Sequence, residues 1–435
     1  MMKSYTYYDE VVETMPRAAL ERLQEERLMR LIPYVYERSP LVKQLWKKAG
    51  ITPKDIRSLA DFRAKAPFAT KAALQGFRDE FRDPACGLIC AGAPRLRGIG
   101  FTSGTTGDPT AMPRGDTYIS DVLLRRDFWH MGARPGDFIS LVHFTFRKGQ
   151  HGDKFVGAGL KPICFAHASH ELPRFLEAST QLRPTVLHQL STPLVLALEK
   201  LIGQTGIDAR DVFSSYKGAV FGGEPLSPRL KNLLASWGLE IYEYTAVGDV
   251  QGAMECSMHD GVHVWEDNAM VEFLDPQGTQ PAANGTRGEL VVTALTDDIA
   301  PLIRYRSEDL VSFERETCKC GRTHVRFEPL GRASDEMLVQ GRSVLPRDIM
   351  EVVELELETR AGLFQIIRPD RSTDVLRVRV GYDPSLLTSS ETELAGRLQE
   401  RIQARLDVPT AIELCDNTEL LKQGPPHKIP RVTRQ

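Results

Sequence analysis

Long apolar runs are missing from this sequence, and no stretch reaches the roughly 18 consecutive apolar residues that a membrane-spanning helix needs. An excess of charge is also missing, because 55 Lys and Arg stand against 58 Asp and Glu and give a net charge of −3. This balance gives no electrostatic argument for binding nucleic acid or an anionic membrane surface. Residues 1–5 lead into polar sequence without the apolar core of a signal peptide. We therefore expect neither nucleic acid nor membrane among the partners.

Cysteine is scarce, with seven residues in a chain of 435. An odd number in a chain of this length does not suggest a disulfide framework. Such usage is typical of a protein in the reducing cytoplasm, which is the compartment we predict. Four cysteines are predicted to be ordinary buried thiols: Cys86, Cys90, Cys164 and Cys415.

The chain is longer than the chains that usually fold around a single hydrophobic core, so we expect at least two domains. Apolar residues at helical spacing predict a helix over 16–36. From about 120 to 245, helix-like stretches alternate with short apolar runs such as 138–142 and 218–221, which is typical of α/β layers. A segment rich in Gly, Pro and Thr predicts a major loop over 84–116.

The predicted secondary structure is different in the second half of the chain. Strands are predicted between about 261 and 315, most clearly at 289–293. Further on, 375–380 alternates with period two, and Ser390-x-x-Glu393 is a capping box that opens a helix. The predicted fold class is α/β. We expect a large multi-layer N-terminal domain of sheets and helices over residues 1–330, joined by a hinge to a small α+β domain over residues 331–435.

A Gly/Thr-rich run occupies residues 102–107. Its glycines let backbone amides approach an anion closely, and its hydroxyl groups can donate hydrogen bonds. Composition alone favours a surface turn, whereas the order of the residues favours a loop that holds a triphosphate. The candidate phosphate-binding residues are Ser103, Gly104, Thr105, Thr106 and Gly107.

The order of several motifs along the chain points to one family. The run 102–107 resembles the phosphate loop of the adenylate-forming superfamily, which includes acyl-CoA ligases, adenylation domains and luciferases. Within this superfamily the chain resembles the phenylacetate–CoA ligase family almost from end to end. The other matching segments are Ala66-Pro67-Phe68-Ala69-Thr70-Lys71, Phe221-Gly222-Gly223-Glu224-Pro225, the run from Pro301 to Leu310, Gly331-Arg332, and His427-Lys428-Ile429-Pro430-Arg431-Val432.

This resemblance implies an acid–thiol ligase. ATP, accompanied by Mg²⁺, and a small carboxylic acid would give an acyl-adenylate and pyrophosphate. Coenzyme A would then attack the adenylate after the C-terminal domain has rotated about residues 331–335. By resemblance the acid is aromatic or arylalkyl. Members of the family commonly pair as dimers, so a homodimer is one candidate assembly, although the sequence itself does not give the oligomeric state.

Two residues are expected to act on the reacting groups. Lys428 aligns with the catalytic lysine of the family, where a cation offsets the charge that builds as a carboxylate attacks the α-phosphate. The alternative is a solvated lysine in a frayed tail. Thr245 belongs to the aligned motif at 242–246 and is the second expected catalytic residue.

The resemblance also assigns the nucleotide contacts. Gly222, Gly223 and Glu224 would line the adenine, although these residues also suit a plain strand-to-helix turn. Asp309 would accept hydrogen bonds from the ribose, unless it only pairs with Arg304 or Arg306. The remaining nucleotide residues are Tyr244 and Arg332, and the expected walls of the acid pocket are Phe144, Tyr242, Val247 and Gly248.

A cysteine pair separated by one residue, Cys318 and Cys320, indicates a metal site. Paired thiolates with a further Cys and His suit tetrahedral zinc. Some members of the resembling family carry zinc here, and the spacing from Cys256 to His263 matches their pattern. We therefore expect structural Zn²⁺ on these four residues. His259 and His324 are the alternative ligands, and a hairpin of reduced cysteines is the alternative to a metal.

Three positions depart from the family pattern. Asp108 follows the loop where Lys is common, and Ala246 stands where a glutamate helps to hold Mg²⁺. Asp249 or Glu243 are the candidate substitutes for that glutamate. The hinge aspartate aligns with Ser334, beside Asp335. Two further hypotheses therefore stay open: transfer of the acyl group to a carrier-protein thiol or an amine, and a nucleotide-binding homologue that has lost catalysis.

Overall fold

The computed structural model describes residues 7–101, 108–115, 120–142, 153–424 and 428–433. Contacts group the chain into two compact units, one made of residues 1–130 with 245–329 and the other of 131–244 with 330–435. Both units mix helices and strands, which confirms the predicted α/β class. The predicted division into domains 1–330 and 331–435 stays a prediction.

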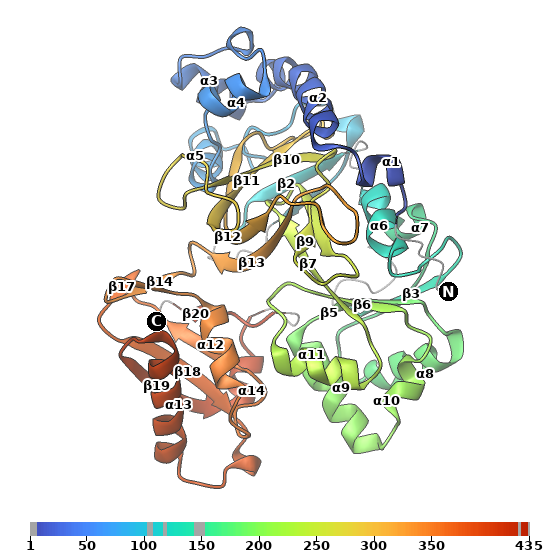
Figure 1. Ribbon diagram of the computed structural model, residues 1–435, viewed down its shortest axis with the longest axis vertical. Helices are drawn as coiled ribbons and strands as arrows, with labels where there is room; N and C mark the ends of the chain where they lie inside the picture. The colour runs from blue at the N-terminus through green and yellow to red at the C-terminus, as the bar shows by residue number, and fades with distance from the viewer. Residues whose placement is uncertain (1–6, 102–107, 116–119, 143–152, 425–427, 434–435) are drawn as a thin grey trace. The chain divides into compact units, whose positions relative to one another are not determined.

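Helices dominate the start of the first unit (Figure 1). Several begin at a residue whose side chain accepts the backbone N–H three positions on, as Ser39, Ser58 and Thr70 do. The longest confirms the helix expected over 16–36. The helices of this unit are α1 (Glu10–Glu13), α2 (Arg17–Arg38), α3 (Pro40–Lys48), α4 (Leu59–Lys65), α5 (Lys71–Phe81) and α6 (Ser120–Trp129), with short 3₁₀ turns at Pro53–Asp55 and Ala93–Arg95.

The strands of the first unit form an antiparallel hairpin and part of a larger sheet. In the hairpin, β1 (Leu96–Phe101) pairs with β2 (Ala111–Gly115) around residues 102–107, which lie outside the described residues. The other strands are β8 (Gln251–Glu255), β9 (Val262–His263), β10 (Ala269–Leu274), β11 (Arg287–Ala294), β12 (Tyr305–Glu314) and β13 (Arg326–Arg332), in the order β10-β11-β12-β13-β9-β8. β11 contains the predicted strand 289–293, which is buried throughout.

The loop expected over 84–116 is therefore only partly a loop. It contains both strands of the hairpin, with Phe101 opposite Ala111. The sequence of β1 gave no strand signal because five of its six residues are exposed, so no apolar alternation is needed. Its pairing with β2 supplies the backbone hydrogen bonds.

The middle of the second unit is built from parallel strands and the helices that connect them. The strand order is β7-β6-β5-β3-β4, and β3 and β6 match the predicted apolar runs. Figure 1 shows α8 to α11 side by side against these strands, where they enclose one hydrophobic core. The elements are β3 (Phe138–Val142), α7 (Asp153–Gly157), β4 (Lys161–Phe165), α8 (Leu172–Leu182), β5 (Val186–Leu190), α9 (Thr192–Thr205), α10 (Ala209–Phe213), β6 (Gly218–Gly222), α11 (Pro228–Ser236) and β7 (Ile241–Val247).

Residues 330–435 of the second unit form their own sheets and core. Ser390 and Glu393 make the predicted capping box at the start of α13. Leu394, Leu398 and Ile402 face the core from this helix. The elements are β14 (Met337–Val339), β15 (Arg342–Val344), α12 (Pro346–Val353), β16 (Phe364–Ile367), β17 (Ser372–Thr373), β18 (Leu376–Tyr382), a 3₁₀ turn at Pro384–Leu386, α13 (Glu391–Leu406), β19 (Thr410–Asp416), α14 (Asn417–Leu421) and β20 (Val432–Thr433).

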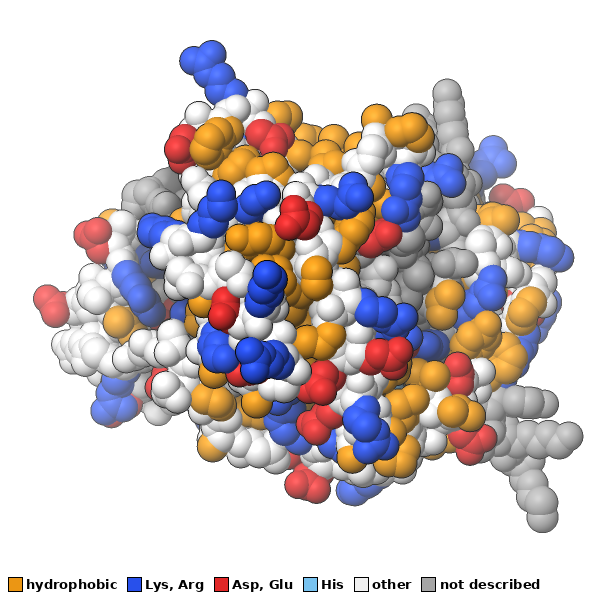
Figure 2. All heavy atoms as spheres, turned by 90° about the horizontal axis from the view of Figure 1, so that it is seen from above, with side chains coloured by type: hydrophobic (Ala, Val, Ile, Leu, Met, Phe, Trp, Pro, Cys, Tyr) orange, Lys and Arg blue, Asp and Glu red, His pale blue; other side chains and the backbone are white. Residues whose placement is uncertain are grey.

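The surface carries charges of both signs. Figure 2 shows Lys and Arg side chains interspersed with Asp and Glu over the face that it views, with hydrophobic side chains between them. Among the described residues, no helix has both the length and the apolar character needed to cross a membrane. Of the four thiols expected to be buried, Cys86 and Cys90 are, whereas Cys164 and Cys415 are half-buried.

Candidate active site and metal centre

The two glycines of the expected adenine motif lie where the parallel strand β6 ends. Gly222 is paired with Tyr244 of β7, and a Cβ on Gly222 would lie 2.9 Å from the Tyr244 carbonyl oxygen. Gly223 has φ +94°, a left-handed conformation that favours glycine. The two strands therefore approach closely at Gly222 because this position lacks a side chain. The carboxyl ends of parallel strands are where open α/β sheets bind ligands.

Glu224 is held by two partners inside the second unit. Its Oε1 accepts from the backbone N–H of Thr192 at 3.1 Å, and its Oε2 accepts from Nη2 of Arg431 at 3.2 Å. The Glu224 side chain is only 1 % exposed. The carboxylate is thus occupied by the protein, and a contact to adenine would come from the backbone.

Arg431 ties the segment that carries Lys428 to the rest of the second unit. Its Nη1 donates to the carbonyl of Gly362 at 2.6 Å, and its guanidinium lies 4.7 Å from the centre of the Phe364 ring. The adjoining β20 pairs in parallel with β16. Lys428 itself is half-buried. The described part of the tail, 428–433, therefore has fixed backbone partners and is not frayed.

The predicted motif at 242–246 runs along β7. Tyr242 is buried, and its ring packs where a Cβ on Gly218 would stand. Thr245 is half-buried and Ala246 is exposed. Val247 is fully buried in the core of the first unit. Roles for Tyr242 and Val247 as pocket walls stay predictions, since both side chains are engaged in packing.

A small pocket lies within the first unit. Its lining includes Arg114 and, directly after the expected pocket residues Val247 and Gly248, Asp249 and Val250. Arg114 donates to the Asp249 carbonyl at 3.0 Å. Gly248 has φ +49°, and a side chain there would collide with Val292. Phe144 lies outside the described residues.

Asp309 lies half-buried on β12. The two arginines that could have formed an ion pair with it are engaged by other carboxylates. Arg304 pairs with Glu272, and Arg306 pairs with Glu289. Arg332 is exposed at the end of β13, where the turn containing Ser334 begins.

Asp108 forms a bidentate ion pair that the sequence did not reveal. Its two carboxylate oxygens accept from Nη1 and Nη2 of Arg78 at 2.7 and 2.9 Å. This hydrogen bonding lowers the pKa of Asp108. Lys71, Gln75 and Arg78 recur at helical spacing along α5, the one signal that could have suggested a partner. The predicted phosphate-binding residues 103–107 lie outside the described residues.

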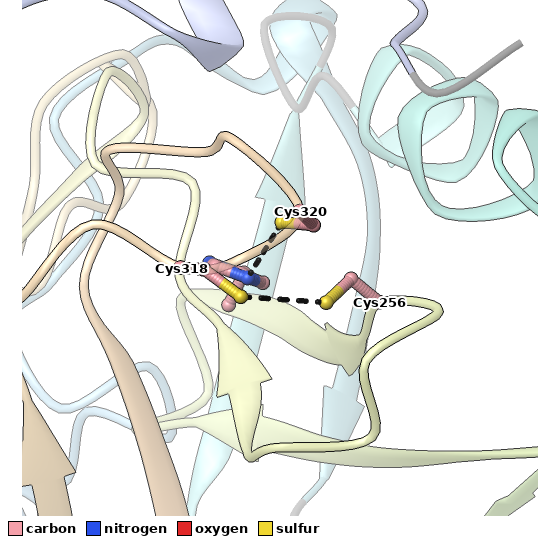
Figure 3. Close-up of side chains that lie close together, drawn as sticks. Cys256, Cys318 and Cys320 are labelled. Atoms are coloured by element: carbon pink, nitrogen blue, oxygen red, sulfur yellow. Dashed lines mark hydrogen bonds between the residues drawn. The ribbon is translucent and has the colours of Figure 1, made fainter. Parts of the chain in front are cut away.

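Four buried side chains meet in the first unit: Cys256, His263, Cys318 and Cys320. Their ligand atoms all lie within 4.8 Å of one another. Figure 3 shows the sulfur of Cys256 facing that of Cys318, and the two atoms lie 3.8 Å apart. The sulfur of Cys320 lies 3.6 Å from Nε2 of His263. In a tetrahedral zinc site with Zn–S near 2.3 Å, sulfur atoms are about 3.8 Å apart. The four residues therefore fit a zinc ion.

Hydrogen bonds distinguish the three candidate histidines. His263 donates from Nδ1 to the carbonyl of His324 at 3.1 Å, which leaves Nε2 directed at the cysteines. His324 uses both ring nitrogens, accepting from the Glu266 N–H and donating to the Val12 carbonyl. His259 pairs with Glu255. The geometry therefore gathers His263, and neither alternative, with the cysteines.

The cluster also polarises its own thiols. A hydrogen bond from Cys256 lowers the pKa of Cys320, with burial acting against it and His263 adding to it. The same hydrogen bond, together with burial, raises the pKa of Cys256. One thiol thus supplies the proton that stabilises another as a thiolate, which is the form that binds a metal.

Curated relatives with one activity match most of the chain. A phenylacetate–coenzyme A ligase of Thermus thermophilus is 31 % identical over 86 % of this chain and 84 % of its own length. Ligases of the same name from Escherichia coli and Aromatoleum evansii are 28 % and 26 % identical, over 93 % and 98 % of this chain and 93 % and 94 % of their own lengths. No family model matches the sequence.

Solved structures share the fold. A 2-hydroxyisobutyryl-CoA ligase in the postadenylation state has a TM-score of 0.84 at 23 % identity, covering all of this chain and 94 % of its own. The same ligase in its thioesterification state has a TM-score of 0.69 at 24 % identity, covering 98 % of this chain and 92 % of its own. On the identity to the Thermus enzyme over most of both chains, this protein belongs to the phenylacetate–coenzyme A ligase family.

Proposed function

We propose that this protein is an AMP-forming acid–coenzyme A ligase. ATP and a small carboxylic acid give an acyl-adenylate and pyrophosphate, and coenzyme A then displaces AMP to form a thioester. The observation that carries the proposal is the 31 % identity to a phenylacetate–coenzyme A ligase across most of both chains. We take the acid to be aromatic or arylalkyl on the same ground.

Several residues of the chain have defined parts in this reaction. Lys428 offsets the negative charge that gathers between the attacking carboxylate and the α-phosphate. The side-chain-free backbone at Gly222 and Gly223 lets adenine lie against the end of β6. Asp309 accepts hydrogen bonds from the ribose hydroxyls. The tie between Arg431 and Glu224 supports the first two roles, because it joins the lysine segment to the adenine motif.

The residues for Mg²⁺ fit less well. The position where the family has a carboxylate is Ala246, and its exposed methyl group cannot bind a cation. Asp249 and Glu243, the candidate substitutes, are both half-buried. Magnesium that accompanies ATP would therefore be held mainly by the phosphates. The negative charge of Asp108 repels the phosphates less than a lone carboxylate would, because Arg78 forms an ion pair with it.

Zinc is the metal proposed for the cysteine cluster. Three thiolates and one imidazole complete a tetrahedral shell and leave no open position for substrate, so the role is structural. The ion would join the end of β8, β9 and the turn at 318–322.

Exchange of labelled pyrophosphate into ATP tests the adenylation step directly. A panel of aromatic, arylalkyl and short aliphatic acids would be offered to the purified protein with ATP and Mg²⁺. We expect exchange that depends on an aromatic or arylalkyl acid. Exchange with none of the acids would favour a nucleotide-binding homologue without catalysis. Exchange only with aliphatic acids would support a ligase but contradict the proposal that its acid is aromatic or arylalkyl.

The acyl acceptor is tested with the best acid from that panel. Coenzyme A, a carrier protein bearing a phosphopantetheine thiol, and simple amines would each be added to the preformed adenylate. We expect the thioester of coenzyme A to form fastest, as measured by mass spectrometry. Faster transfer to a carrier protein or to an amine would assign the chain to a different acceptor class.

A further inference from the structure

The N-terminal strap, defined as residues 7–15, covers the cysteine cluster. Four hydrogen bonds to backbone carbonyls join the strap to the segment 320–324, which begins at one of the proposed ligands. They run from the Tyr7 hydroxyl to the Cys320 carbonyl at 2.6 Å, from the Thr323 N–H to the Glu13 carbonyl at 3.3 Å, from the Thr323 hydroxyl to the Met15 carbonyl at 2.6 Å, and from His324 Nε2 to the Val12 carbonyl at 2.9 Å.

A buried ion pair lies beneath the strap. Arg322 donates from Nε and Nη2 to Oε2 of Glu13 at 2.9 and 2.8 Å, and the two side chains are 1 % and 0 % exposed. Oε1 of Glu13 accepts from the backbone N–H groups of Tyr8 and Asp9 at 2.8 and 2.9 Å. The Glu13 carboxylate thus accepts hydrogen bonds from the Arg322 guanidinium and from two backbone N–H groups of the strap itself.

Arg322 also faces the cluster. Its Nη1 lies 3.6 Å from the sulfur of Cys320, and its guanidinium lies 5.3 and 5.7 Å from the ring centres of Tyr7 and Trp265. A guanidinium stays charged at every physiological pH. It is therefore a permanent cation against a ligand sulfur, held between two aromatic faces.

The charges explain why the ion pair is there. Three thiolates and a neutral imidazole around a divalent metal leave a net charge of −1, and a buried net charge is costly unless it is paired. Arg322 provides the opposite charge. Its own burial is tolerated because Glu13 binds it, and Glu13 is in turn satisfied by the strap's backbone. Removing any one of these groups leaves another buried without its partner.

We propose that Arg322, positioned by Glu13 of the N-terminal strap, is the counter-charge that retains the metal, so that metal binding and docking of the strap depend on each other. The inference rests on the zinc site proposed above and not on the ligase activity. Groups that orient and balance metal ligands typically contribute 10–100-fold to metal affinity. The strap would therefore dock weakly on a cluster that has lost its metal.

The test uses the full-length protein, purified without chelator, and measures zinc content followed by zinc transfer to a chromogenic chelator. Glu13→Gln keeps the shape of the side chain but removes its charge. Glu10→Gln is the matched control, because Glu10 is exposed in the same helix. We expect Glu13→Gln to lose zinc about 10–100 times faster than the parent protein, and Glu10→Gln to match the parent.

A second measurement covers the case in which Glu13→Gln does not fold. Hydrogen exchange of residues 7–15 is compared in the parent protein before and after zinc is removed, and we expect protection to fall when zinc leaves. Parent protein with well below one equivalent of zinc would remove the metal site itself. A full equivalent, with equal release from both variants and unchanged exchange in the strap, would keep the site and overturn the coupling.

Discussion

At the scale of single residues, Lys428 makes the sharpest prediction. Lys428→Ala should lower the rate of acid-dependent pyrophosphate exchange by about 10²–10³, the usual loss for one preorganised charge at a transition state. The control is Lys422→Ala, an exposed lysine just after α14. Unchanged exchange in Lys428→Ala, with the acid bound normally, would exclude this lysine from the reaction.

The Arg78–Asp108 pair predicts a charge effect on ATP. Arg78→Gln should raise the KM for ATP about two- to fivefold, the scale of a partly exposed pair, because it leaves the Asp108 charge without its partner after the Gly/Thr-rich run. The double variant Arg78→Gln/Asp108→Asn should return toward the parent value, since it removes both charges. Initial rates at varied ATP provide the measurement. A double variant as impaired as the single one would show that the pair acts through structure and not through charge.

At this scale the sequence is informative about candidate ligands that lie close together in the chain. It is less informative about side-chain partners that lie far apart in the chain. Cys318 and Cys320, together with a further Cys and His, predicted a metal site, which stays a prediction. The choice of His263 needed the family pattern, and the structure now gathers it with the cysteines. Neither the Arg78–Asp108 pair nor the Arg431–Glu224 pair was predicted, because no periodicity links residues 30 or 207 positions apart.

At the scale of elements, α6 carries a buried acid whose titration is measurable. Asp127 accepts a hydrogen bond from Nε1 of Trp265 at 2.9 Å. Burial raises the pKa of Asp127 to about 7, against that hydrogen bond and the neighbouring Arg126 charge. In the unfolded chain the carboxyl ionises near its ordinary value of 3.8. Stability from this group is therefore present below pH 3.8 and is lost as pH rises to about 7.

The variant Asp127→Asn should remove this dependence, because its amide oxygen can still accept from Trp265 and does not ionise. We expect its melting temperature, relative to the parent, to rise between pH 5 and pH 7 and to level off above pH 7, as followed by calorimetry. Asp370→Asn, at an exposed position, is the control. A constant offset across this range would mean that Asp127 is ionised throughout.

Elements were predicted well where their own side chains determine them. The capping box of α13 and the buried strand β11 carry apolar or capping patterns that survive without tertiary context. The β1–β2 hairpin was missed because an exposed strand has no apolar period, and only its partner fixes it. Strand β9 has two residues, Val262 and His263, and depends on its neighbours in the same way.

At the scale of the whole molecule, the sequence predicted one boundary near residue 330, whereas each compact unit of the structure combines two separate stretches of the chain. Local sequence patterns can mark where the predicted secondary structure changes along the chain, but they cannot show which distant stretches pack together. The turn after β13 is where the predicted hinge lies. The N–H of Asp335 donates to the Arg332 carbonyl at 2.9 Å, so Ala333 is the second residue of a four-residue turn.

Proline at this second position fits such a turn and fixes its φ. Ala333→Pro should therefore favour the turn seen here, in which Arg431 holds the Lys428 segment against Glu224. If the second half-reaction needs a different hinge conformation, pyrophosphate exchange should persist while thioester formation from preformed adenylate slows about two- to fivefold, in keeping with the 0.4–1 kcal/mol that a compatible proline contributes. Ala333→Ser, which leaves φ free, should change neither rate. Equal rates of both half-reactions in Ala333→Pro and the parent would place the moving joint elsewhere in the chain.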